Sequence, residues 1–176
     1  MHPKSYYLDL RKNYTPENIK LIFVFESPPE SGSYFYDSTG PTSEPLFNEL
    51  MKLINVKPTT KHEGLNAFTN RGLLLTDATY TPVNGISNNR LRDKTIMENF
   101  ANLKHELLTL SPNQETPVVL AKVNVCDLLE KPLKQAGFNI VNQGLRVPFP
   151  SNSNQRRFHE AISMLQLETE LGDQHF

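Results

Sequence analysis

One segment of this chain, residues 146–158, combines a stiff backbone with side chains that bind anions. Pro148 and Pro150 hold the backbone in an extended shape directly before a helical pattern. The hydroxyl, amide and guanidinium groups that could bind phosphate beside the N–H groups of a helix start are Ser151, Asn152, Ser153, Asn154 and Arg157. We therefore predict that this segment binds a substrate. The alternative is that its polar side chains are simply exposed to solvent on the first turn of the helix.

Two other segments place polar side chains directly after apolar runs. Glu26 and Ser27 follow the run 20–25, and Asp77 ends the run 72–77. Ligands bind beyond the carboxyl ends of the strands in an open parallel sheet, so we expect these residues at one site. The alternative for Glu26 is a turn cap or an ion pair with an arginine. The alternative for Asp77 is a buried acid that nearby hydroxyl or N–H groups satisfy.

Strands and helices alternate along the chain and would position these residues. Strands are predicted from the apolar runs 20–25, 72–77 and 117–121, with a weaker fourth at 138–141. Strands separated by helices indicate right-handed crossovers. We therefore predict an α/β fold, a three-layer α/β/α sandwich around a central, mainly parallel four-stranded sheet.

Apolar spacing and capping residues predict the helices. They span about 46–54, 100–110, 124–137 and 158–165, whereas 55–71 and 81–93 are predicted to be long loops. Ser43 is the expected cap of the first helix, and Thr95 with Glu98 forms a capping box before the second. Pro132 is expected to interrupt the third.

Length and charge bound the class of protein. The 176 residues, 38% of them apolar, predict one domain over 1–176, with a core at about 20–166 and a polar tail at 167–176. Proteins that bind long nucleic acid through many phosphates are usually basic, but the formal net charge here is −1. Any contact with DNA or a nucleotide-type ligand is therefore expected to be local.

Cysteine and histidine usage excludes several kinds of site. Cys126 is the single cysteine, so the chain can form neither an internal disulfide nor a four-cysteine cluster. His62, His105 and His159 lack the spacing of metal ligands, and we predict no metal and no cofactor. No apolar run reaches the roughly 18 residues of a membrane helix, and no signal-peptide pattern is present, so the predicted location is cytoplasmic.

Taken together, three segments resemble the motifs of uracil-DNA glycosylases. Residues 25–29, Phe-Glu-Ser-Pro-Pro, are similar to the Gly-Glu-Ala-Pro-Gly form of the family's first motif. Residues 72–81 are similar to its strand Gly-Val-Leu-Leu-Leu-Asn-Ala-Val-Leu-Thr, and residues 149–151 to its His-Pro-Ser motif. The likeness runs from about 20 to 165 and implies a uracil-DNA glycosylase-like fold.

The resemblance implies a role for individual residues. Glu26 and Ser27 fall in the motif that positions water in several branches of the family. Phe35, or otherwise Tyr36, lies at the distance of the aromatic that stacks on the extruded base, with core packing as the alternative. Asp77 aligns with the Asn that reads the base.

Three departures from the family bear on its chemistry. Phe149 stands in place of a histidine that donates a hydrogen bond to the leaving base, an effect worth about 2.7–4 kcal/mol in other enzymes. Ser27 is a poor base, so Glu26 would have to compensate. An ionised Asp77 can only accept hydrogen bonds, which suits a base with an exocyclic amine; it would have to be protonated to read uracil.

Three functions follow as alternatives. The leading prediction is a divergent DNA glycosylase that recognises an extruded base and hydrolyses its N-glycosidic bond without a cofactor. The second is a catalytically inactive module that binds nucleic acid or a nucleotide. The third is a hydrolase of a free nucleoside, which would explain why a strongly basic composition is missing.

Overall fold

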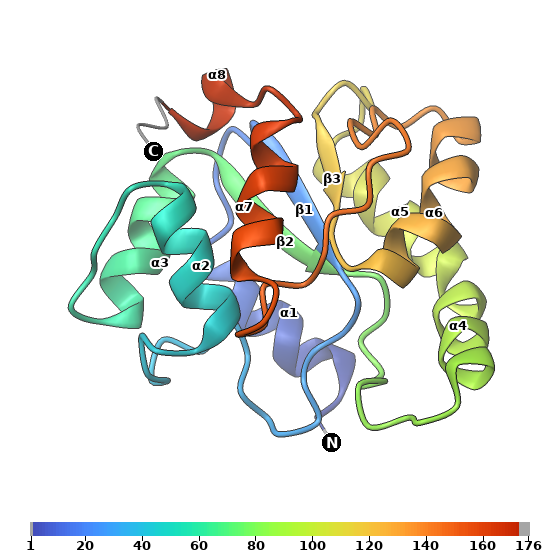
Figure 1. Ribbon diagram of the computed structural model, residues 1–176, viewed down its shortest axis with the longest axis horizontal. Coiled ribbons are helices and arrows are strands. Elements are labelled where there is room, and N and C mark those ends of the chain that lie inside the picture. Colours follow the sequence, from blue (N-terminus) through green and yellow to red (C-terminus); the bar gives the residue numbers. More distant parts are fainter. Residues whose placement is uncertain (1, 173–176) are drawn as a thin grey trace.

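Short apolar runs form the strands of this α/β fold, and helices fill most of the chain between them (Figure 1). A computed structural model describes residues 2–172. The strands are β1 (Leu21–Phe25), β2 (Leu73–Asp77) and β3 (Val118–Leu120). The helices are α1 (Lys4–Lys12), α2 (Pro45–Leu53), α3 (Lys61–Asn70), α4 (Asn89–Glu98), α5 (Phe100–Leu110), α6 (Val123–Gln135), α7 (Gln155–Ser163) and α8 (Glu168–Leu171).

The strands form a parallel sheet in the order β2-β1-β3, within the described residues. β1 lies in the centre, and its last residue, Phe25, is paired with Asp77 at the end of β2. Alternate residues of β1 point to opposite faces, because side chains alternate along a strand. Phe23 packs in a core cluster with residues of α1, α2, α3 and α7, whereas Val24 packs in a second cluster with residues of α4, α5 and α6. Helices therefore cover both faces of the sheet (Figure 1).

The predicted fourth strand at 138–141 does not form as a strand. Val118 and Ile140 make an isolated parallel bridge, and Ala121 and Val147 make another. Between the bridges, the Asn142 side chain replaces a strand backbone: its Oδ1 accepts from Leu120 N–H at 2.7 Å, and its Nδ2 donates to Leu120 C=O at 2.9 Å. The edge of β3 is thus satisfied without a continuous fourth strand, and the four-stranded prediction was wrong.

The stretches predicted to be loops contain helices. α3 occupies most of 55–71, and Thr60 caps it by accepting a hydrogen bond from Glu63 N–H at 3.1 Å. α4 begins inside the second predicted loop, and Asn88 caps it through Leu91 N–H. Thr95 therefore lies within α4 and caps no helix, contrary to the prediction.

Other helix boundaries also differ from the predictions. α2 starts at Pro45 with Glu44 as its N-cap, in place of Ser43. α6 runs through Pro132 without a break; this residue lies near the helix end, where a proline removes one hydrogen bond. The core also extends beyond 20–166, because Tyr7 and Leu171 belong to it. Residues 173–176 of the predicted tail lie outside the described residues.

Candidate functional site

A cavity of about 860 Å³ lies at the carboxyl ends of the three strands. The predicted site residues that line it are Glu26, Ser27, Phe35, Asp77, Phe149, Ser151 and Asn154. Tyr36, Asn152, Ser153 and Arg157 do not line it. Segments that lie far apart in the sequence therefore meet here, because parallel strands end at one edge of the sheet.

Asp77 is buried at this edge with a carboxyl group that is not fully satisfied. The residue is only 4% exposed, and its Oδ2 has no hydrogen-bond partner within residues 2–172. The pKa of Asp77 is raised from 3.8 to about 8: burial is the main cause, the charges of Glu106 and Glu26 add to it, and Arg11 opposes the shift. Asp77 is therefore mainly protonated at pH 7 and offers both an O–H donor and a C=O acceptor, as an amide does.

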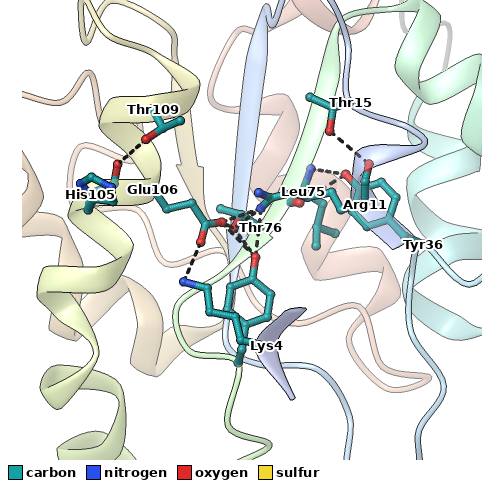
Figure 2. A network of polar contacts seen from close by, with 10 residues as sticks. Lys4, Arg11, Thr15, Tyr36, Leu75, Thr76, His105, Glu106 and Thr109 are labelled. Atoms are coloured by element: carbon teal, nitrogen blue, oxygen red, sulfur yellow. Dashed lines mark hydrogen bonds and ion pairs between the residues drawn. The ribbon is translucent and has the colours of Figure 1, made fainter. Parts of the chain in front are cut away.

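A network of polar contacts surrounds Thr76, the residue before Asp77 (Figure 2). Arg11 of α1 donates to Thr76 Oγ1 at 2.9 Å and forms an ion pair with Glu106 of α5. The Tyr80 hydroxyl donates to Glu106 at 2.9 Å. Burial alone would raise the pKa of Glu106, but Arg11 and the hydrogen bonds lower it below its ordinary value. Glu106 is therefore a fixed negative charge that disfavours ionisation of Asp77.

Glu26 is held by partners from two other elements. Its carboxylate contacts Lys122 Nζ, lies 3.3 Å from Arg92 Nε, and accepts from Asn124 Nδ2 at 2.6 Å. The ion-pair alternative for Glu26 is therefore present in the structure. These three contacts leave an acceptor site on the carboxylate for a further donor such as water, since its two oxygens offer about four such sites.

Lys122 adopts a strained backbone at the end of β3. Its φ of 87° lies in a region that residues other than glycine rarely adopt, at a typical cost of about 1–3 kcal/mol. Its N–H donates to Val147 C=O at 2.8 Å, and its side chain pairs with Glu26. These contacts hold Lys122 at the cavity, of which it forms part of the lining.

Lys122, Asn124 and Arg92 were missed as candidates from the sequence. Lys122 and Asn124 directly follow the apolar run 117–121, so the strand-end rule that selected Asp77 could have found them. Arg92 gave no such signal, because it lies on α4, well after the end of β2.

Aromatic rings form the apolar wall of the cavity. Phe149 packs edge-on against Phe25, with ring centroids 6.0 Å apart. Phe35 lines the cavity but also packs against Phe68 at 5.3 Å, so it belongs to the core as well. Tyr36 is fully buried, and its hydroxyl donates to Leu75 C=O at 3.2 Å and accepts from Leu75 N–H at 2.8 Å. Tyr36 therefore satisfies the outer edge of β2.

The serine- and asparagine-rich turn before α7 contributes only part of the predicted phosphate site. Ser151 and Asn154 line the cavity and are joined by a hydrogen bond from Asn154 Nδ2 to Ser151 Oγ at 3.3 Å. Asn152, Ser153 and Arg157 are exposed. Ser27 accepts from Val83 N–H at 3.2 Å, which fixes the loop after β2.

Apart from Asp77, the cavity lining contains more acids than bases. The acids are Glu26, Glu44, Asp93 and Asp127, and the bases are Arg92 and Lys122. Most of these acids are paired: Glu26 with Lys122 and Arg92, Glu44 with Lys61, and Asp127 with Arg146, so the lining has no strong excess of either charge. Within residues 2–172, no group of three or more His, Cys, Asp or Glu side chains could hold a metal ion. No helix of the described chain has the length and apolar character needed to cross a membrane.

A second hollow of about 990 Å³ lies between α2 and α7, away from the strand ends. Its buried acid, Glu49, is paired with Lys52 at 2.6 Å and with His159 at 2.7 Å. We place the candidate site in the strand-end cavity, because the three motif segments meet there and Asp77 Oδ2 has no hydrogen-bond partner within residues 2–172.

Comparisons of this chain with protein-family models, curated proteins and solved structures gave no match. The likeness to uracil-DNA glycosylases therefore rests on the motifs of the sequence.

Proposed function

We propose that this chain is a divergent uracil-DNA glycosylase-type protein that binds a nucleobase in the strand-end cavity. The observation that carries the proposal is that all three motif segments, 25–29, 72–81 and 149–151, contribute to the lining of one cavity. A volume of about 860 Å³ is within the range of small-molecule pockets, roughly 300–1,000 Å³. The uracil-DNA glycosylase-like fold is part of this proposal.

Asp77 is the proposed base reader. In its protonated form, its C=O accepts from N3–H of uracil and its O–H donates to O4, as the family's Asn does. Phe35 and Phe149 supply apolar ring surface for a base. The buried acid is therefore compatible with a uracil-type base at neutral pH.

Hydrolysis of the glycosidic bond is proposed to be slow. Phe149 cannot donate a hydrogen bond to the leaving base, and loss of one such donor costs about 10²–10³ in rate in other enzymes. Glu26 is the proposed water-positioning residue, and its contacts with Lys122 and Asn124 hold its carboxylate in place.

A free nucleoside is the second candidate ligand, because the lining offers no excess of positive charge for phosphates. The bases of the lining, Arg92 and Lys122, are both paired with Glu26. A nucleoside carries no phosphate and needs no such charge, whereas a DNA strand brings several phosphates.

The deciding experiment compares oligonucleotides with free nucleosides. Single-turnover assays on oligonucleotides with uracil or other damaged bases measure base release, and calorimetry with the matching deoxynucleosides measures binding. The proposal is supported if Asp77→Ala abolishes base release or binding and the exposed control Glu98→Gln retains it. If the wild-type protein neither binds nor cleaves any of these probes, the proposed function is wrong.

A further inference from the structure

Three side chains that line the strand-end cavity keep a buried polar atom without a hydrogen-bond partner in the described chain. These atoms are Tyr34 Oη, Asp77 Oδ2 and Asn124 Oδ1. Proteins satisfy nearly all buried polar atoms, so each exception calls for an explanation. Three exceptions around one cavity indicate polar positions that a ligand completes.

Two of these residues, Tyr34 and Asn124, do not belong to the motifs, and Tyr34 is the more buried of the two. It is 2% exposed, and its ring packs edge-on against Tyr7 at 4.9 Å between centroids. Its backbone carbonyl accepts from Lys61 Nζ at 2.7 Å, and Lys61 is anchored in turn by Glu44 Oε2 at 2.8 Å. Ring and backbone are therefore fixed, so the hydroxyl cannot swing out to solvent.

The electrostatic surroundings of Tyr34 connect its hydroxyl to the base-reading position. Burial raises the pKa of Tyr34 well above its ordinary value, and the charges of Asp77, Tyr80 and Tyr36 raise it further, against the opposing effect of Arg11. The hydroxyl therefore keeps its proton at physiological pH. Tyr34 and Asp77 both line the strand-end cavity.

Tyr36, two residues further on, shows how this fold treats a structural tyrosine. Tyr36 is as deeply buried as Tyr34, and its hydroxyl both donates to and accepts from the Leu75 backbone. Of these two buried hydroxyls, that of Tyr36 is hydrogen-bonded to the backbone, whereas that of Tyr34 has no hydrogen-bond partner in the described chain.

We propose that the Tyr34 hydroxyl donates a hydrogen bond to the bound ligand and, with Asp77, selects an uncharged base that carries a carbonyl oxygen. A donor on Tyr34 requires an acceptor on the ligand, and the bases of the lining, Arg92 and Lys122, are already paired with Glu26, so neither is free to bind an anion. This inference rests on the proposed function and adds a residue that determines ligand specificity.

The test compares Tyr34→Phe with the matched control Tyr36→Phe. Each change removes one hydroxyl from a buried ring, but of the two only the Tyr36 hydroxyl has a hydrogen-bond partner among residues 2–172. Urea unfolding measures stability, and calorimetry measures the Kd of deoxyuridine, with thymidine and deoxycytidine for comparison. We expect Tyr34→Phe to keep or raise the urea midpoint and to weaken deoxyuridine binding about tenfold or more. Tyr36→Phe should lower the midpoint and leave the Kd within about twofold.

The possible results separate this inference from the proposed function. If Tyr34→Phe lowers the urea midpoint as much as Tyr36→Phe does, the hydroxyl has a structural partner and the inference is wrong. If Tyr34→Phe binds deoxyuridine as the wild type does, the inference fails and the proposed function stands. If the wild-type protein binds none of the deoxynucleosides, the proposed function fails and the inference fails with it.

Discussion

Glu106 on α5 and Arg11 on α1 form a buried ion pair beside Thr76, the residue that leads into Asp77 (Figure 2). The pair joins two helices to the end of β2, and Lys4 adds a contact to Glu106 at 3.4 Å. A buried charge is tolerated when it is paired and hydrogen-bonded, and here Thr76 and Tyr80 complete the pairing. Asp77 thus follows a charged network whose members do not line the strand-end cavity.

Glu106→Gln should destabilise the protein strongly, because it leaves the Arg11 guanidinium buried without a counter-charge. The expected loss in unfolding free energy is about 3–5 kcal/mol in urea denaturation at neutral pH. The double change Arg11→Met with Glu106→Leu should cost less than Glu106→Gln alone, since it removes both charges. Glu98→Gln breaks an exposed pair with Lys94 and should change stability by about 0.5 kcal/mol or less. Equal effects at Glu106 and Glu98 would contradict the proposed burial of the network.

Asp77→Asn should stabilise the protein at pH 8 but not at pH 4. The pKa of Asp77 is about 8 in the folded chain against an ordinary 3.8, so over this range the folded state holds a proton that the unfolded state has lost. The unfolding free energy of the wild type therefore falls as pH rises from about 4 through 8, and the amide removes this contribution. Urea denaturation across this pH range measures the difference.

Asp37→Asn provides a control of opposite sign for this experiment. Hydrogen bonds from Thr39 lower the pKa of Asp37, so its ionised form stabilises the fold above its unfolded pKa and that contribution is lost at low pH. The Asp37 variant should not gain stability at pH 8. If the unfolding free energy depends on pH in the same way in the wild type and in Asp77→Asn, Asp77 is ionised in the folded protein at neutral pH.

The central strands could be predicted from the sequence, because β1 and β2 are apolar runs buried on both faces. α3 could not, since its stretch is rich in polar and helix-breaking residues and packs through a few positions such as Leu65 and Phe68. The edge of β3 was mispredicted because a side chain, Asn142, takes the place of a strand backbone. The apolar periodicity of a segment carries no information about such a contact between residues that are distant in the sequence.

The same limit applies to the candidate site. Glu26 follows β1 and Asp77 ends β2, so the strand-end rule predicts that both lie at this edge of the sheet, where both line the cavity. Their charged partners lie on helices distant in the sequence: Arg92 of α4 is 3.3 Å from Glu26, and Glu106 of α5 adds to the effect of burial on the pKa of Asp77. Sequence position therefore located these chemical groups but not their charged partners.

Phe149→His should raise the rate of base release if the cavity cleaves a glycosidic bond. The Phe149 ring lies against Phe25 at the cavity wall, so an imidazole there could donate to a leaving base. Loss of a comparable donor costs about 10²–10³ in other enzymes, and we expect a gain of at least about tenfold in single-turnover release of uracil. Phe149→Leu is the control, because it changes the ring without adding a donor. Equal rates for the His and Leu variants would argue against a leaving-group role at this position.

The ligand preference of the wild-type protein should change with pH through Asp77. Below about pH 8 the neutral carboxyl can donate to O4 of uracil, and above it the carboxylate can only accept, which favours the exocyclic amine of cytosine. A mismatched acceptor pair in a buried site costs about 1–3 kcal/mol, so the ratio of deoxyuridine to deoxycytidine affinity should fall roughly 5- to 150-fold as pH rises through this range. Calorimetry at about one pH unit on either side of 8 measures this ratio. Asp77→Asn keeps both a donor and an acceptor at every pH, so it reveals any titration of the ligands themselves. A ratio that changes equally in wild type and Asp77→Asn would show that Asp77 does not read the base.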